Sequence, residues 1–152
     1  MAGRAGRAIR RPPAFWDTSA LVPLCVRQAM TPRAMALHRT YDLVVWWSTS
    51  VEMASAFARL VRMSQLTPGE LAQARQLAAD LADTWSVILP SDALRTKAAQ
   101  LVERFDLRAA DALQLAAALV WCGDVPQGRV FLTTDQKLRE AALLSGFNAP
   151  QI

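Results

Sequence analysis

Four acidic residues of this chain are placed where they could bind a divalent metal ion together. Each lies where an apolar, strand-like run gives way to a helix, or in the first turn of a helix: Asp17, Glu52, Asp111 and Asp135. In a sheet built from strand–helix units, such positions can converge on one crevice at the ends of the strands. Clustered carboxylates repel one another unless a cation lies among them. All four acids are therefore predicted to be metal ligands and catalytic residues.

The ligand chemistry indicates which ion and which reaction to expect. An all-oxygen site without His or Cys favours a hard cation, so Mg²⁺ or Mn²⁺ is the expected cofactor. Such an ion activates a bound water and stabilises charge on a leaving oxygen, which is the chemistry of phosphodiester hydrolysis. Asp111 gives the strongest indication of a metal site, because it lies among alanines and leucines, where an unpaired carboxylate is unfavourable.

Each acid also has a structural explanation. Asp17 and Asp135 could simply cap the helices that follow them. Glu52 is the fourth residue of a Thr-x-x-Glu capping box that begins at Thr49, and Asp111 suits the positive end of a helix dipole.

The sequence lacks the residues that other catalytic mechanisms would need. His38 is the only histidine. Its position in a helix beside Arg39 favours a solvated or partly packed side chain, so neither paired-histidine cleavage nor a Ser-His-Asp relay is expected. The chain also has no G-x-x-x-x-G-K-[ST] loop and no G-x-G-x-x-G turn. Metal-activated water is the chemistry that remains.

The positive charge is concentrated at the N-terminus. The chain of 152 residues has a formal charge of +4, with 17 basic and 13 acidic residues. Arg4, Arg7, Arg10 and Arg11 precede the first apolar run, and without them the count is 17 − 4 = 13 basic against 13 acidic residues. Residues 1–13 are therefore predicted to be an Arg-rich, disordered extension, and residues 14–152 a single neutral domain.

The composition also predicts a location. No apolar stretch after the basic start resembles a secretory signal, and the longest apolar run, 115–122, is far shorter than the roughly 20 residues that span a bilayer. Cys25 and Cys122 are the only cysteines, and reduced, mostly buried thiols are expected. A cytoplasmic protein without a membrane partner is predicted.

Apolar runs alternate with helical periodicity along the chain. Strands are expected at 14–17, 43–47, 85–89 and 130–133, with a short final strand within 147–152. Helices are expected at 18–27, 31–40, 50–64, 68–83, 92–105, 107–121 and 135–144. Pro23 is compatible with the first helix only in its first turn. This alternation predicts an α/β fold, a three-layer α/β/α sandwich around a mainly parallel sheet of four to five strands.

Four blocks of sequence resemble the PIN-domain ribonucleases, especially the VapC-like toxins of VapBC toxin–antitoxin systems. Phe15 to Val22 resembles the opening strand with the first acid, and Ser48 to Ala56 resembles the second block, around Glu52. Leu107 to Ala118 is similar to the third and most distinctive block, and Phe131 to Leu138 to the Thr-x-Asp block with the fourth acid. The resemblance extends from about Ala14 to the C-terminus. The long Arg-rich extension and Pro23, which interrupts a helix that commonly continues, depart from the family pattern.

The resemblance implies a PIN-like fold and a Mg²⁺- or Mn²⁺-dependent endoribonuclease. It also implies a homodimer, an RNA substrate and a cognate antitoxin whose C-terminal segment occupies the acidic groove. Thr18, Ser19 and Thr134 flank the acids, and Thr18 and Thr134 are the predicted supporting hydroxyls. Trp46 and Trp47 are expected to divide between core and surface. Residues that adjoin the strand ends and could contact RNA phosphates are Arg27, Arg59, Arg62, Arg108 and Lys137.

Three other functions stay open at this point. A PIN-fold binding or regulatory module could dock RNA or a protein in the acidic groove without turnover. A structural α/β domain could use the acids only as helix caps. A phosphohydrolase with Asp17 as nucleophile is disfavoured, because Asp17-Thr18-Ser19 lacks the second aspartate that haloacid-dehalogenase-like enzymes place two residues after the first.

Overall fold

The computed structural model describes residues 10–152. Most of the predicted Arg-rich extension, residues 1–9, lies outside the described residues. Its last part is described: Arg11 Nε lies 2.9 Å from Asp42 Oδ1, and the first strand begins at Pro13. The domain boundary at residue 14 stays a prediction.

Four parallel strands form one sheet with the order β3-β2-β1-β4. The strands are β1 (Pro13–Trp16), β2 (Asp42–Trp46), β3 (Ser86–Ile88) and β4 (Phe131–Leu132). The predicted α/β fold with a central parallel sheet is confirmed. A fifth strand within 147–152 is wrong, because this segment contributes only an isolated parallel bridge between Val130 and Asn148.

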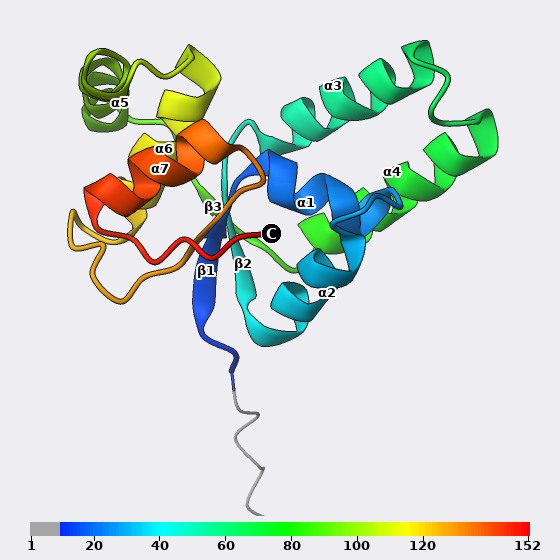
Figure 1. Cartoon of the computed structure of the whole chain (residues 1–152), viewed down its shortest axis with the longest axis horizontal. Helices are drawn as coiled ribbons and strands as arrows, with labels where there is room; N and C mark the ends of the chain where they lie inside the picture. Colours follow the sequence, from blue (N-terminus) through cyan, green and yellow to red (C-terminus); the bar gives the residue numbers. More distant parts are fainter. Residues whose placement is uncertain (1–9) are drawn as a thin grey trace, which may run out of the picture.

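Helices cover both faces of the sheet. They are α1 (Thr18–Cys25), α2 (Thr31–Thr40), α3 (Thr49–Arg62), α4 (Pro68–Ala82), α5 (Asp92–Phe105), α6 (Ala109–Trp121) and α7 (Gln136–Ser145). Strand side chains alternate between two cores. Phe15 and Phe131 stack with ring centroids 5.4 Å apart on the face covered by α5 to α7. Trp16 and Leu132 point to the opposite face, which α1 to α4 cover (Figure 1).

Two local expectations are wrong. Pro23 lies well inside α1, past its first turn. Proline cannot donate to the carbonyl four residues earlier, here that of Ser19, and the Thr134 hydroxyl donates to this carbonyl at 3.5 Å instead. Thr49 does not begin a capping box, since it is the first residue of α3 and Ser48 is the N-cap. The Thr49 hydroxyl is buried without a hydrogen-bond partner among the described residues.

The N-terminus of α5 offers a stability test of the helix that packs against α6. Ser91 is the N-cap of this helix, and its Oγ accepts a hydrogen bond from the Leu94 N–H at 3.1 Å. Ser91→Ala is expected to lower the free energy of unfolding by about 1 kcal/mol, whereas Ser91→Gly should cost only a few tenths (~0.3 kcal/mol). Urea denaturation of both variants measures the difference. Equal losses would mean that the cap contributes nothing beyond helix propensity.

No helix within residues 10–152 is long and apolar enough to cross a membrane. Both cysteines are free thiols, as expected, and burial raises the pKa of Cys25 to about 12.

Candidate active site

A pocket opens where the carboxyl ends of β1 and β4 meet. The chain leaves β1 toward β2 on the face of α1 and α2, and it returns to β4 over the opposite face through α5 and α6 (Figure 1). Neighbouring strands whose connections diverge in this way leave a crevice at their ends. The pocket has a volume of about 280 Å³. Its lining includes Asp17, Glu52, Asp111 and Asp135, so all four predicted acids meet at one site.

Asp17 is the most deeply buried of the four acids. Its side chain is 5% exposed at the end of β1, where it caps α1. Asp17 Oδ2 accepts hydrogen bonds from Ser19 Oγ and from Thr133 Oγ1, at 2.5 and 2.9 Å. Burial raises the pKa of Asp17 to about 6, although these hydroxyls lower it, and the nearby charges of Glu52 and Asp111 raise it further. The capping role and membership of the acidic pocket therefore coexist.

Glu52 lies in the first turn of α3, and side chains from three parts of the chain hold its carboxylate. Oε2 accepts from Thr18 Oγ1 at 2.5 Å and from Gln114 Nε2 at 2.8 Å. Oε1 accepts from Ser48 Oγ at 2.9 Å. None of these bonds is the reciprocal capping box that Thr49 would have formed. The interpretation of Glu52 as only a cap is therefore wrong.

Asp111 and Asp135 complete the acidic wall. Asp111 is the third residue of α6 and half-buried, so it is less enclosed than the apolar sequence around it predicts. Burial raises the pKa of Asp111, as do the charges of Asp135 and Glu52, while Arg108 and Lys137 oppose the shift. Asp135 is exposed and caps α7, with Oδ1 2.7 Å from the Leu138 N–H. The charges of Asp135 and Glu52 thus disfavour the charged form of Asp111.

The donor set fits a hard cation in its chemistry, because four carboxylates line one pocket and no His or Cys of residues 10–152 lines it with them. Within residues 10–152, however, no three Asp, Glu, His or Cys side chains are already arranged closely enough to hold an ion. The hydrogen bonds give a physical reason. Both Glu52 oxygens, Asp17 Oδ2 and Asp135 Oδ1 accept hydrogen bonds from neighbouring groups. Binding an ion would require these side chains to turn part of their oxygen lone pairs toward it.

Some of the predicted supporting residues lie at the acidic pocket and others do not. Thr18 bonds Glu52 directly, and Thr134 lines the pocket with its N–H 2.9 Å from Ser19 Oγ. Arg59 of α3 lines the pocket. Lys137 forms an ion pair with Asp106 at 2.8 Å, and Arg108 is the N-cap of α6. Arg27 and Arg62 are absent from the pocket lining within the described residues. Trp46 is buried and Trp47 is 59% exposed, as expected.

Three polar residues of the site were not predicted from the sequence: Ser48, Gln114 and Thr133. The sequence could have indicated Gln114 as a site residue, because it lies three residues after Asp111 on the same face of a helix that is otherwise almost apolar. Thr133 had none, since its contact with Asp17 depends on β1 and β4 being neighbours.

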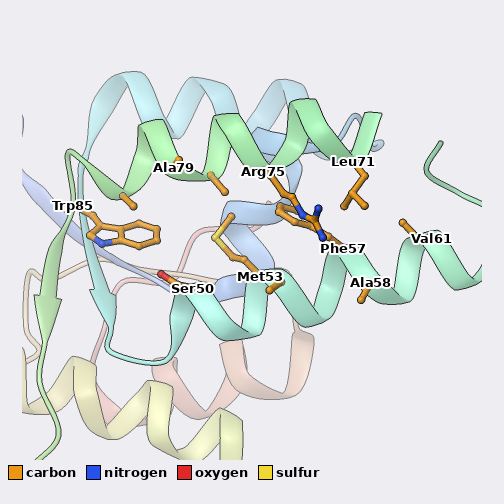
Figure 2. Close-up of a pocket in the computed structure, with 12 residues that line it drawn as sticks. Ser50, Met53, Phe57, Ala58, Val61, Leu71, Arg75, Ala79 and Trp85 are labelled. Atoms are coloured by element: carbon orange, nitrogen blue, oxygen red, sulfur yellow. The ribbon is translucent and has the colours of Figure 1, made fainter. Parts of the chain in front are cut away.

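An apolar groove lies on the other side of α3, between α3 and α4, with a volume of about 420 Å³. Figure 2 shows Met53 and Phe57 of α3 pointing toward α4, with Trp85 at one end and Leu71 at the other. Arg75 is the one charged residue of the lining in the described part of the chain. Helix α3 therefore separates an acidic pocket from an apolar groove.

Comparisons with solved structures identify the fold. One match is a chain of a toxin–antitoxin complex from Klebsiella pneumoniae, with 18% identity, a TM-score of 0.61 and coverage of 91% of this chain and 99% of that one. A second is FitAcB from Neisseria gonorrhoeae, with 18% identity, a TM-score of 0.59 and coverage of 89% and 96%. A third is PAE2754 from Pyrobaculum aerophilum, with 18% identity, a TM-score of 0.58 and coverage of 86% and 79%.

The chain has a PIN-like fold. At 18% identity these similarities concern the fold of the PIN-like domain. No family model and no curated protein matches the sequence.

Proposed function

We propose that this PIN-like domain is a metal-dependent endoribonuclease and the toxin of a toxin–antitoxin pair. The observation that carries the proposal is the pocket at the ends of β1 and β4, to which four distant segments each bring one acid. The fold shared with a chain of a toxin–antitoxin complex supports the biological role.

Asp17, Glu52, Asp111 and Asp135 would hold Mg²⁺ or Mn²⁺ in this proposal. When bound, the ion would supply an activated water and stabilise negative charge at the scissile phosphate. The protein's own hydroxyls orient the acids: Ser19 and Thr133 fix Asp17, and Thr18 fixes Glu52. Arg59, at the pocket wall, is placed to contact a phosphate of the RNA. Attack by water needs no covalent intermediate on the enzyme.

A cleavage assay with the purified protein tests this function. We expect a structured RNA to be cut in Mg²⁺ or Mn²⁺ and to stay intact in EDTA. RNA binding without cleavage under any metal condition would contradict the nuclease and favour the alternative, a PIN-fold module that docks RNA or a protein in the acidic groove. Because that alternative shares the fold, turnover is the observation that separates the two.

The proposed protein partner is an antitoxin. A segment with basic side chains would complement the acidic pocket, and apolar side chains would suit the groove between α3 and α4 (Figure 2). Both hollows share α3, so one partner segment that covers this helix reaches both. A reading frame for a small DNA-binding protein immediately upstream of this one is the genomic observation that the proposal requires. A homodimer of the toxin belongs to the same proposal, and sedimentation of the purified protein tests it.

A further inference from the structure

Gln114 is an unusual residue in the core of this domain. Its side chain is 1% exposed in α6, between alanines and leucines that pack against the sheet. Its amide nitrogen Nε2 lies 2.8 Å from Glu52 Oε2 and 3.1 Å from Thr18 Oγ1. Its carbonyl oxygen Oε1 is buried without a hydrogen-bond partner among the described residues. The residue is therefore satisfied only on the side that faces Glu52.

The hydrogen-bond chemistry fixes how this amide is oriented. A carboxylate accepts hydrogen bonds and cannot donate them, so the NH₂ group and not the carbonyl must face Glu52. The Thr18 hydroxyl donates a hydrogen bond to Glu52 Oε2. Because Thr18 Oγ1 and Glu52 Oε2 lie only 2.5 Å apart, both are on the same side of the Gln114 amide nitrogen, and one N–H points toward both acceptors. The three side chains form a closed triangle of hydrogen-bonding contacts.

A polar side chain that leaves its carbonyl unpartnered in a core is unfavourable for stability, and an apolar residue of the same size would avoid that loss. Packing therefore does not explain Gln114. Its position does have a use at the site. Gln114 follows Asp111 by three residues, so one face of α6 presents an acid to the pocket and an amide to a second acid that comes from α3.

We infer that Gln114 is a positioning residue that holds the Glu52 carboxylate and the Thr18 hydroxyl in place for metal binding. This inference rests on the proposed function. The Glu52 carboxylate has only limited freedom to rotate while Thr18, Ser48 and Gln114 hold it, so its remaining lone pairs keep one direction toward the pocket. Gln114 would act through Glu52, without touching the ion or the RNA.

The test is Mn²⁺ binding by the purified protein, measured by calorimetric titration. Gln114→Met keeps the length and volume of the side chain and removes the amide. We expect it to weaken Mn²⁺ binding by about 10- to 100-fold, the usual loss for an outer-shell partner of a metal ligand. The matched control is Gln76→Met, which removes an amide–carboxylate bond of 2.9 Å to Asp80 on exposed α4. The control should bind Mn²⁺ as the wild type does.

A double-mutant cycle separates positioning from a general structural effect. In a Glu52→Gln background, Gln114→Met should change Mn²⁺ affinity by less than threefold (~2-fold), because the carboxylate it orients is already gone. An equal loss in both backgrounds would overturn the inference. Urea denaturation of each variant reports folding, and Thr18→Val, which removes another side of the triangle, provides a second variant should Gln114→Met not fold.

The outcomes also separate this inference from the proposed function. Wild-type protein that binds Mn²⁺, together with a Gln114→Met variant that binds it equally well, would overturn the positioning role alone. A Thr18→Val variant with wild-type affinity would do the same. Wild-type protein without Mn²⁺ binding would overturn the metal-dependent function, and this inference with it.

Discussion

Asp111→Asn is expected to lower the rate of Mg²⁺-dependent RNA cleavage by at least about 100-fold. Loss of an outer-shell partner typically costs about 10- to 100-fold in affinity or activity, and a direct ligand should reach or exceed the top of that range. The fold should survive, because the third position of α6 gives a carboxylate only the helix-dipole interaction, typically about 0.3–1 kcal/mol. The measurement is single-turnover cleavage of a structured RNA, with the free energy of unfolding determined in parallel.

Asp92→Asn is the matched control for this substitution. Asp92 is also an acid in the first turn of a helix, but it lies at the start of α5, exposed and paired with Arg95 at 2.9 Å. If Asp111 serves only the helix dipole, the two variants should lose similar stability and both should cleave RNA. If Asp111 belongs to the active site, only Asp111→Asn should lose cleavage. Retained cleavage by Asp111→Asn would remove this residue from the proposed mechanism.

Local patterns were sufficient to predict most elements of the fold. Apolar runs of five or fewer residues between helical stretches indicated the strands. Helical periodicity indicated the helices, of which α4 and α5 begin at the capping residues Thr67 and Ser91. The expected acids meet because each follows a strand or begins a helix, and parallel strands place those points at one edge of the sheet. Pairing within 147–152 could not be judged in this way, since a single bridge and a strand have the same local sequence pattern.

Contacts between distant segments could not be predicted. Trp16 of β1 is in register with Leu132 of β4, which places the next residues, Asp17 and Thr133, side by side. Without knowing that β1 and β4 are neighbours, Thr134 was as good a candidate as Thr133. The interpretation of Glu52 as part of a capping box failed for a similar reason. Besides the Ser48 hydroxyl at the start of its own helix, its carboxylate binds Thr18 and Gln114, 34 and 62 residues away in the chain.

Asp17→Asn is expected to stabilise the metal-free protein at pH 7.5 by about 1–2 kcal/mol. Burial raises the pKa of Asp17 from 3.8 to about 6, and this shift corresponds to at most about 3 kcal/mol of unfavourable free energy when the group is charged in the folded state. The helix dipole of α1 opposes the effect by about 0.3–1 kcal/mol. The asparagine carbonyl can still accept from Ser19 and Thr133. The desolvation penalty is larger than the helix-dipole contribution, so removing the charge should stabilise the folded protein.

The pH dependence follows from the sign of the shift. Because the folded-state pKa lies above the unfolded value, the folded protein binds more protons between about pH 4 and pH 6. Stability from this group is therefore present below about pH 4 and is lost as the pH rises to about 6. Urea denaturation in EDTA should show nearly equal stabilities of wild type and Asp17→Asn at pH 4.5, and a clear advantage for the variant at pH 7.5. Asp135→Asn is the control, since Asp135 is exposed and also an N-cap.

Adding Mn²⁺ at pH 7.5 should reverse that order. An ion that binds only the folded state stabilises it by an amount that grows with the ratio of ion concentration to Kd. Wild-type protein should therefore gain stability in Mn²⁺, whereas Asp17→Asn, which lacks one of the proposed ligands, should gain much less. A wild type that is less stable than the variant both in EDTA and in saturating Mn²⁺ would mean that no ion offsets the buried charge. In that case metal binding would not explain why the protein keeps a buried carboxylate at position 17. A basic segment of a protein partner would then be the next source of positive charge to test.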